Sequence, residues 1–326
     1  MFTSAELSGH LQQWRTILGG RPHLGAEQSG RELWPVIADD GHRFILKRLG
    51  PWRNLPVADQ ARVLSHLAKS AISVSEHLIT DDAKLYAGTV EDSFTLLPYI
   101  DHDEPRTAES VEADRLAGGM VASMHEALAT YPWRVNSYTE KYIESLDSEL
   151  LLPPDILELF HRDRDGITGR LAPLTLQLVH GDLTPDNVLV RLESESVAFI
   201  DFDHLPFAPR VWDISRYLSR RFRRESPADA LGNVSAFVSS YCRTSPLADV
   251  ELAAIPAMIA AMTVLEASWT TRILSGQLER RLLPAQRAEL DPMLDALRWQ
   301  FNNEDKLEAA IRAELPSTRG SSRSAP

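Results

Sequence analysis

Hydrophobic and polar positions follow two different patterns on either side of residue 100. The first part contains short apolar runs of strand length, separated by turn signals. Two of these runs, residues 32–38 and 43–49, flank the sequence Asp39-Asp40-Gly41, which is typical of a tight hairpin turn. The pattern therefore predicts two hairpin-connected strands early in the chain.

One helix is expected in the same part of the chain. After Pro56, apolar residues recur at helical spacing, namely Val63, Leu64, Leu67 and Ala71. Two more short strands are expected near residues 84–87 and 93–100. The first hundred residues are therefore predicted to form a β-rich lobe with one helix.

Longer helical patterns dominate from Asp101 onward. A helix after Pro105 has one apolar face, formed by Ala117, Met120, Val121, Met124 and Leu128. Gly118-Gly119 within this helix would let another backbone approach closely. Amphipathic helices follow over residues 211–315, and the polar tail 316–326 predicts disorder.

Composition and charge limit the classes of function. The net charge is −12, of which residues 1–100 contribute only −1, and 44% of the residues are hydrophobic. Such acidity disfavours a nucleic-acid or membrane partner and mildly favours a cationic or neutral substrate. The single cysteine, Cys242, excludes an intrachain disulfide and fits a cytoplasmic location. The longest apolar stretch, Ala253 to Leu265, is too short to span a bilayer and predicts a buried helix.

The most informative segment is LVHGDLTPDNVLV, residues 178–190. A hydrophobic strand leads into His180-Gly181-Asp182, and Asn187 directly precedes the next strand. A third strand, expected over residues 197–202, carries Asp201-Phe202-Asp203 at its end. Carboxylate and amide side chains are thus expected to meet at the ends of neighbouring strands.

This spacing fits phosphoryl transfer from a nucleoside triphosphate. The reaction needs a carboxylate that orients the acceptor hydroxyl and takes its proton, and hard oxygen ligands that hold Mg²⁺ against the phosphates. Asp182 could serve the acceptor, while Asn187 and Asp201 could hold the metal. Protein kinases place the same groups in H-R-D-x-x-x-x-N followed by D-F-G.

The sequence HGD-x-x-x-x-N followed by I-D-x-D resembles the aminoglycoside phosphotransferase and choline kinase superfamily, which also includes homoserine kinases. Gly181 in place of an arginine, and Asp203 in place of the D-F-G glycine, favour this superfamily over the protein kinases. The resemblance covers about residues 20–220 and is most specific over residues 178–203. It implies a bilobal, protein-kinase-like fold.

The resemblance also implies a nucleotide site in the first part of the chain. Lys47 would contact the α- and β-phosphates, and Ser29 would lie in the nucleotide loop. Leu97 and Tyr99 belong to a segment, residues 94–100, that is similar to the strand whose backbone binds adenine.

Further roles are implied around the catalytic loop. His180 would stabilise the loop, and Asp213 of the Trp212-Asp213 pair would support it through hydrogen bonds. Asp203 would be either a second metal ligand or a capping residue. The run Arg220–Arg224 could face a phosphate or an acidic partner, but a solvated helix end is the preferred interpretation.

Two departures from the superfamily pattern leave other classes open. The helix after Lys47 usually presents a glutamate to this lysine, whereas the best-fitting positions here hold Asp59-Gln60. The glycine loop lacks G-x-G-x-x-G, and no P-loop motif occurs. A non-catalytic nucleotide-binding regulator therefore remains an alternative, as does a Ser/Thr protein kinase, although no A-P-E-like segment follows Asp203.

The sequence as a whole predicts an α+β protein with a bilobal, protein-kinase-like fold. A nucleotide-binding lobe is expected over residues 1–97, a catalytic and acceptor-binding lobe over 98–313, and a disordered tail over 314–326. The expected co-substrate is ATP or GTP, with Mg²⁺ as cofactor. The expected partner is a small-molecule hydroxyl acceptor, either an aminoglycoside-like antibiotic or a metabolite such as choline, ethanolamine, homoserine or a sugar derivative. The oligomeric state stays open.

Overall fold

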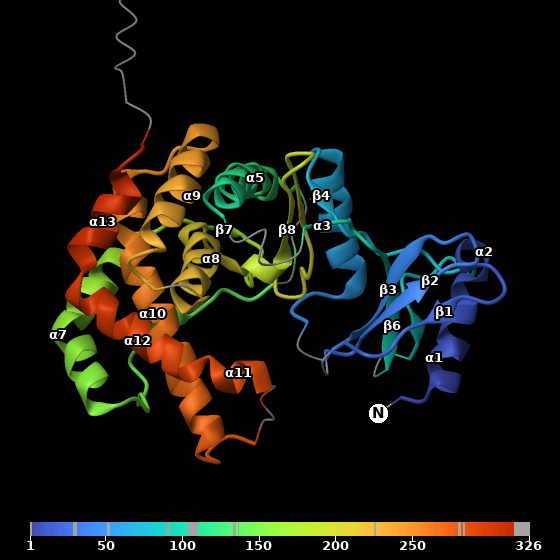
Figure 1. Ribbon diagram of the computed structural model, residues 1–326, viewed down its shortest axis with the longest axis horizontal. Coiled ribbons are helices and arrows are strands. Elements are labelled where there is room, and N and C mark those ends of the chain that lie inside the picture. The colour runs from blue at the N-terminus through green and yellow to red at the C-terminus, as the bar shows by residue number, and fades with distance from the viewer. Residues whose placement is uncertain are drawn as a thin grey trace, which may run out of the picture.

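A small lobe rich in strands lies beside a larger helical lobe (Figure 1). The computed structural model describes residues 2–28, 31–50, 53–89, 92–103, 110–132, 135, 137–224, 226–279, 282 and 284–315. The small lobe is built on a five-stranded antiparallel sheet with the order β1-β2-β3-β6-β5. These strands are β1 (His23–Leu24), β2 (Leu33–Ile37), β3 (Arg43–Leu49), β5 (Ala87–Gly88) and β6 (Ser93–Pro98).

The predicted hairpin is confirmed. Strands β2 and β3 pair antiparallel, with Leu33 opposite Lys47. The Gly41 amide donates to the Ala38 carbonyl at 3.0 Å, and Gly41 has φ +87°. A positive φ is readily adopted only by glycine, which is why the Asp-Gly turn signal was informative.

The prediction of one helix in the small lobe was wrong. Before the sheet, the chain forms α1 (Ser4–Leu11), a 3₁₀ turn (Gln12–Trp14) and α2 (Arg15–Leu18). Their apolar residues pack with Trp34 and Phe94 in a core of their own, to which they contribute Leu7, Leu11, Trp14 and Leu18. The sequence did contain a signal for the start of α1. Thr3 and Glu6 form a capping box, in which each side chain accepts a hydrogen bond from the other residue's amide.

Helix α3 (Val57–Lys69) belongs to the large lobe by its packing. Its buried residues Val63, Leu64 and Leu67 share a hydrophobic core with α5 (Val111–Ala129). Strand β4 (Ser73–Val74), just after it, pairs in parallel with β9 (Ser196–Phe199), which also pairs with β8 (Val188–Arg191). Figure 1 accordingly shows α3 and β4 between the five-stranded sheet and the helical lobe. Ala71 lies beyond the end of α3, at φ +61°.

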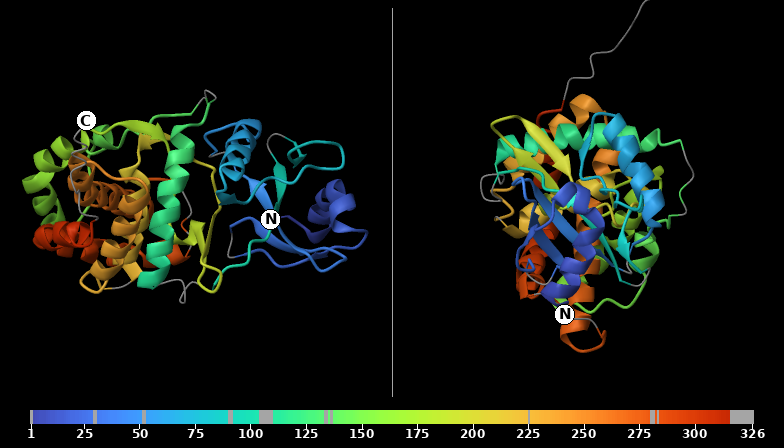
Figure 2. Two further views of the ribbon diagram at one scale, coloured as in Figure 1. Left: turned by 90° about the horizontal axis from the view of Figure 1, so that it is seen from above. Right: turned by 90° about the vertical axis from the view of Figure 1, so that its right-hand side faces the viewer.

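Close helix packing forms the interior of the large lobe, which Figure 2 shows from two further directions. Helix α5 packs against α9 (Leu231–Thr244), and a Cβ added to Gly118 would lie 2.2 Å from the Phe237 carbonyl oxygen. The close backbone approach expected at Gly118-Gly119 is therefore confirmed at Gly118. The other helices are α6 (Tyr142–Ser145), α7 (Pro154–Leu171), α8 (Val211–Arg224), α10 (Asp249–Leu274), α11 (Pro284–Ala288), α12 (Leu290–Asn302) and α13 (Glu304–Arg312).

The buried helix expected around residues 253–265 is α10. It extends to 26 residues, so by length and composition alone it could cross a membrane. However, 72% of its most apolar window lies inside the molecule, packed against α7, α8 and α12. This is the burial expected of a core helix in a globular protein.

Candidate active site

The loop between β7 (Leu176–Leu178) and β8 brings together His180, Asp182 and Asn187. His180 is fully buried, and its Nε2 bonds the Ile200 carbonyl at 2.9 Å. Asn187 ends a short 3₁₀ turn (Pro185–Asn187), and its Nδ2 donates to the Asp182 carbonyl at 2.8 Å. These hydrogen bonds of His180 and Asn187 thus fix the loop backbone on both sides of Asp182.

The first turn of α8 holds this loop from the other side. The backbone amides of His180 and Gly181 donate to the two oxygens of Asp213, at 2.8 and 2.9 Å. Trp212 Nε1 donates to the Gly181 carbonyl at 2.9 Å. Asp213 is fully buried and also bonds His125 Nε2 at 3.0 Å. The two bonds from the His180 and Gly181 amides are of the kind that the resemblance implied for Asp213, and together with the Trp212 bond they stabilise the backbone before Asp182.

Gly181 is expected to be hard to replace. It has φ +90°, and an added Cβ would lie 2.3 Å from Pro206 Cδ. Gly181→Ala should therefore lower the free energy of unfolding by about 1–3 kcal/mol, because the backbone must move or the proline must shift. Chemical denaturation would measure the loss, and Gly166→Ala, with nothing within 4 Å of its Cβ, is the control. Equal stability of the two variants would contradict the expectation.

Lys47 of β3 reaches across to the loop that follows β9 in the large lobe. Its Nζ lies 2.6 Å from Asp201 Oδ1 and 2.9 Å from Asp203 Oδ2. Burial alone would lower the pKa of Lys47, but the charges of Asp201 and Asp203 raise it instead. Asp201 has φ +65°, a strained backbone conformation of the kind that concentrates at functional sites. The sequence-predicted phosphate-binding and metal-binding residues thus meet between the lobes.

In the structure, neither Asp59 nor Gln60 takes the place of the usual glutamate beside Lys47. Asp59 pairs with Arg62 on the surface of α3. Gln60 is buried and donates from Nε2 to Asp203 Oδ1 at 3.1 Å. Among the described residues, neither side chain forms a hydrogen bond or ion pair with Lys47, whose charge is balanced by Asp201 and Asp203. Both oxygens of Asp203 are therefore engaged, one by Lys47 and one by Gln60.

Placing a glutamate at residue 60 is expected to destabilise the folded protein. Gln60→Glu would replace a donor to Asp203 with a second carboxylate, so we expect the free energy of unfolding to fall by about 1–3 kcal/mol. Thermal or urea unfolding would measure this loss. Gln60→Leu is the matched control, because it removes the hydrogen bond without adding a charge, and it should lose less. If Gln60→Glu matched the wild-type stability, Lys47 would have exchanged Asp203 for the new carboxylate.

Asp182 carries a contact that the sequence analysis missed. Arg216 of α8 donates from Nε and Nη2 to Asp182 Oδ1, at 3.1 and 2.9 Å. Burial would raise the pKa of Asp182, but the charges of Arg216 and His204 lower it below its ordinary value. This contact could have been anticipated from spacing. Arg216 lies one helical turn after Trp212 and therefore on the helix face that meets the loop.

The interpretation of Arg220–Arg224 as a solvated helix end was wrong. The side chains of Arg221 and Arg223 are only 1% and 2% exposed. Arg221 pairs with the fully buried Asp114, and Arg223 with Glu266 and Glu289. The carboxylates that neutralise this run come from distant segments of the chain, so the local sequence gave no sign of them.

The strand expected to bind adenine is β6. Its Leu97 pairs with Ile45, and the Tyr99 amide donates to the Arg43 carbonyl at 3.0 Å, so the backbone groups of both residues face β3. By the alternation of an antiparallel strand, the carbonyl of Pro98 faces the opposite edge, where it accepts from Ser75 Oγ at 3.2 Å, and proline has no amide hydrogen to donate. The adenine contacts assigned to Leu97 and Tyr99 would thus come from their side chains or neighbours. Ser29 lies outside the described residues.

Asn187 and Asp201 have the oxygen donors that suit Mg²⁺. The described residues contain no group of three or more His, Cys, Asp or Glu side chains that could hold a metal ion. In phosphoryl-transfer sites, Mg²⁺ is usually bound by one or two side chains, several waters and the substrate phosphates. Asp201 suits the role because its side chain is 43% exposed, whereas Asp203 is 5% exposed.

Comparison with known proteins also indicates a phosphotransferase. Residues 25–247 match the family model described as the phosphotransferase enzyme family. An uncharacterized protein of Deinococcus radiodurans is 26% identical over 276 residues, which cover 79% of this chain and 78% of the relative. The structure is similar to a microcompartment-associated aminopropanol kinase, with TM-score 0.70, 15% identity, and 95% and 100% of the two chains covered. It is also similar to amicoumacin kinase hAmiN, with TM-score 0.66, 15% identity, and coverages of 92% and 94%.

These likenesses confirm the predicted α+β, bilobal, protein-kinase-like fold. ATP as phosphoryl donor and Mg²⁺ as metal are consistent with the matched family. With its family match spanning the catalytic loop and the Lys47 site, the chain belongs to the phosphotransferase enzyme family and is a small-molecule phosphotransferase.

Proposed function

We propose that this protein transfers the terminal phosphoryl group of ATP or GTP to a hydroxyl group of a small, amine-bearing molecule. The observation that carries the proposal is the ion pair between Lys47 of the small lobe and Asp201. This pair lies beside the loop that contains Asp182 and Asn187. In this reaction the acceptor oxygen bonds the terminal phosphorus while the bond to the bridging oxygen breaks. The hydroxyl proton passes to Asp182, and a nucleoside diphosphate leaves.

The residues predicted around the phosphates and the catalytic loop each have a proposed role in this reaction. Asp182 orients the acceptor hydroxyl, and Lys47 contacts the phosphates. Asn187 and Asp201 would hold Mg²⁺, which would neutralise phosphate charge during transfer. Asp203 as a second metal ligand remains a prediction, and it would require Asp203 to give up Lys47 or Gln60. His180 and Asp213 keep the loop in shape.

Support for an amine on the acceptor comes from the segment beside the catalytic loop. The rings of Tyr142 and Trp212 lie 5.5 Å apart, and Trp212 bonds the Gly181 carbonyl next to Asp182. Burial and the charge of Glu140 raise the pKa of Tyr142 to about 12. Burial and the charges of Glu140 and Asp182 likewise raise the pKa of Tyr138. Tyr142 is only 4% exposed and belongs to the core, whereas Tyr138 is 39% exposed. Tyr138, close to the carboxylates of Glu140 and Asp182, is therefore the ring of this segment that an ammonium group could reach.

The acceptor is either an aminoglycoside-like antibiotic or an amino-alcohol metabolite, in a protein that we expect to act in the cytoplasm. Release of ADP or GDP with Mg²⁺ should be measured against aminoglycosides, peptide antibiotics, aminopropanol, choline, ethanolamine, homoserine and hydroxylated sugars. Acceptor-dependent release by the wild type but not by Asp182→Asn would support the proposal and name the acceptor class. Nucleotide binding without transfer to any acceptor or polypeptide would favour the regulator, and transfer to a polypeptide would favour a protein kinase.

A further inference from the structure

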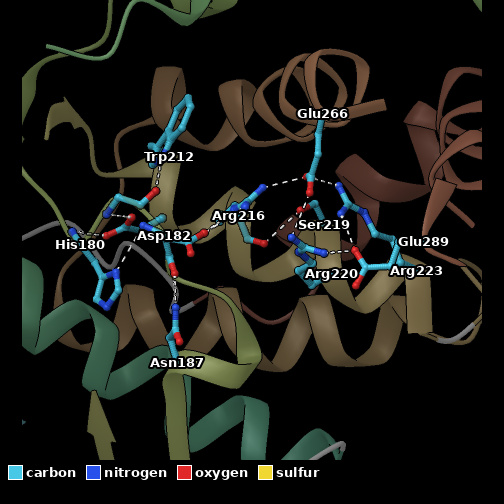
Figure 3. A network of polar contacts seen from close by, with 12 residues as sticks. His180, Asp182, Asn187, Trp212, Arg216, Ser219, Arg220, Arg223, Glu266 and Glu289 are labelled. Atoms are coloured by element: carbon cyan, nitrogen blue, oxygen red, sulfur yellow. Dashed lines mark hydrogen bonds and ion pairs between the residues drawn. The ribbon is translucent and has the colours of Figure 1, made fainter. Parts of the chain in front are cut away.

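A ladder of alternating charges begins at Asp182 and runs into the helical lobe (Figure 3). Arg216 occupies the first position, with two donors on one oxygen of Asp182. Its Nη1 donates to Glu266 Oε2 of α10 at 2.8 Å. The guanidinium group is therefore held at both ends, between α10 and the catalytic loop, and its side chain is only 19% exposed.

Glu266 is itself held by two further arginines of α8. Arg220 Nη2 donates to Oε1 at 3.0 Å, and Arg223 Nη2 donates to Oε2 at 2.7 Å. Both arginines also contact Glu289, the residue before α12. Three guanidinium groups thus face three carboxylates, those of Asp182, Glu266 and Glu289. Because these charges balance, the cluster is not suited to attract an anion, and it instead fixes the position of each of its members.

We infer that Arg216 is a positioning residue for the phosphoryl transfer proposed above, and that Glu266 holds Arg216 in place. Two donors on Oδ1 fix the plane of the Asp182 carboxylate and leave Oδ2 for the acceptor hydroxyl. The inference rests on the proposed function, because positioning matters only if Asp182 handles an acceptor. Kinases of this fold accelerate transfer almost entirely by positioning and electrostatics, so a misdirected carboxylate should be costly.

The expected effect is on kcat rather than on nucleotide binding. Arg216→Ala should lower kcat by about 10²-fold, the cost of a misplacement near 1 Å. The nucleotide KM should stay close to that of the wild type, since the nucleotide contacts proposed here lie on the Lys47 side. Arg216→Lys keeps the charge but not the paired donors, so it should recover stability more fully than kcat.

The experiment uses the full chain, with kcat expressed per folded molecule and with the acceptor found in the panel above. Millimolar guanidinium should partly restore kcat of Arg216→Ala by filling the vacated position, and it should not restore Asp182→Asn. Arg210→Ala is the matched control, since Arg210 is equally shielded and pairs with Glu251, away from Asp182. It should lose stability but keep kcat. A wild-type kcat in Arg216→Ala would overturn the inference, as would a loss explained fully by unfolding.

A second measurement separates failure of this inference from failure of the proposed function. In a double-mutant cycle, Asp182→Asn and Arg216→Ala should show a non-additive effect on the free energy of unfolding. If the wild type transfers phosphate to no acceptor, the proposed function fails. The cycle still decides whether Arg216 holds Asp182 in solution, and strict additivity would overturn that contact regardless of activity.

Discussion

Asp182→Asn should lower kcat by about 10²- to 10⁴-fold, the usual contribution of a positioned acid–base group, while nucleotide still binds. The amide cannot take the acceptor proton, and it loses the charged contact with Arg216. Lys47, Asp201 and Asp203 remain in place on the nucleotide side. The loss should therefore appear in kcat and not in the dissociation constant of the nucleotide.

A neighbouring carboxylate offers a matched control for this variant. Asp186 lies four residues further along the same loop and pairs with Arg224 at 2.7 Å, with its side chain 42% exposed. Asp186→Asn should keep kcat near the wild-type value, because exposed ion pairs contribute little. Single-turnover transfer and nucleotide titration would be measured for both variants. If both lost activity equally, the loop as a whole, rather than the Asp182 carboxylate, would be essential.

Features that depend on residues close together in the sequence could be predicted without a structure. The run from His180 to Asn187 contains a short-range bond, from Asn187 to the Asp182 carbonyl, and its spacing between two strands is visible in the chain. The hairpin at Gly41 and the strand containing Lys47 follow from turn chemistry and periodicity in the same way. These features could be predicted because residue types and spacing close together in the chain indicate them, although Asp213 and Trp212 also hold the loop from a distance.

Contacts between distant segments could not be predicted. Asp203 replaces a helix glutamate as a partner of Lys47, yet the two residues are 156 positions apart. Glu266 and Asp114 bury arginines that look solvated when α8 is considered alone. Such pairings require the tertiary fold, since a buried guanidinium is tolerated only where carboxylates from other elements meet it.

Glu266→Gln should be the most destabilising of the variants considered, at about 3–5 kcal/mol, the usual cost of removing one partner of a buried ion pair. Glu266 accepts from Arg216, Arg220 and Arg223, and the amide would leave these guanidinium groups short of one negative charge. Urea unfolding at neutral pH would measure the change. Glu144→Gln is the control, because Glu144 is 71% exposed and pairs only across the surface with Lys141.

The pH dependence of this loss distinguishes the charge of Glu266 from its shape. Burial would raise the pKa of Glu266, but the three arginines lower it far below its ordinary value of 4.5. A lowered pKa in the folded state stabilises the protein above pH 4.5, and this contribution is lost as the pH falls. The stability difference between wild type and Glu266→Gln should therefore be constant near neutral pH and shrink by about 1.4 kcal/mol per pH unit below 4.5. A difference that did not change with pH would mean that packing of the side chain, rather than its ionisation, holds α8 against α10.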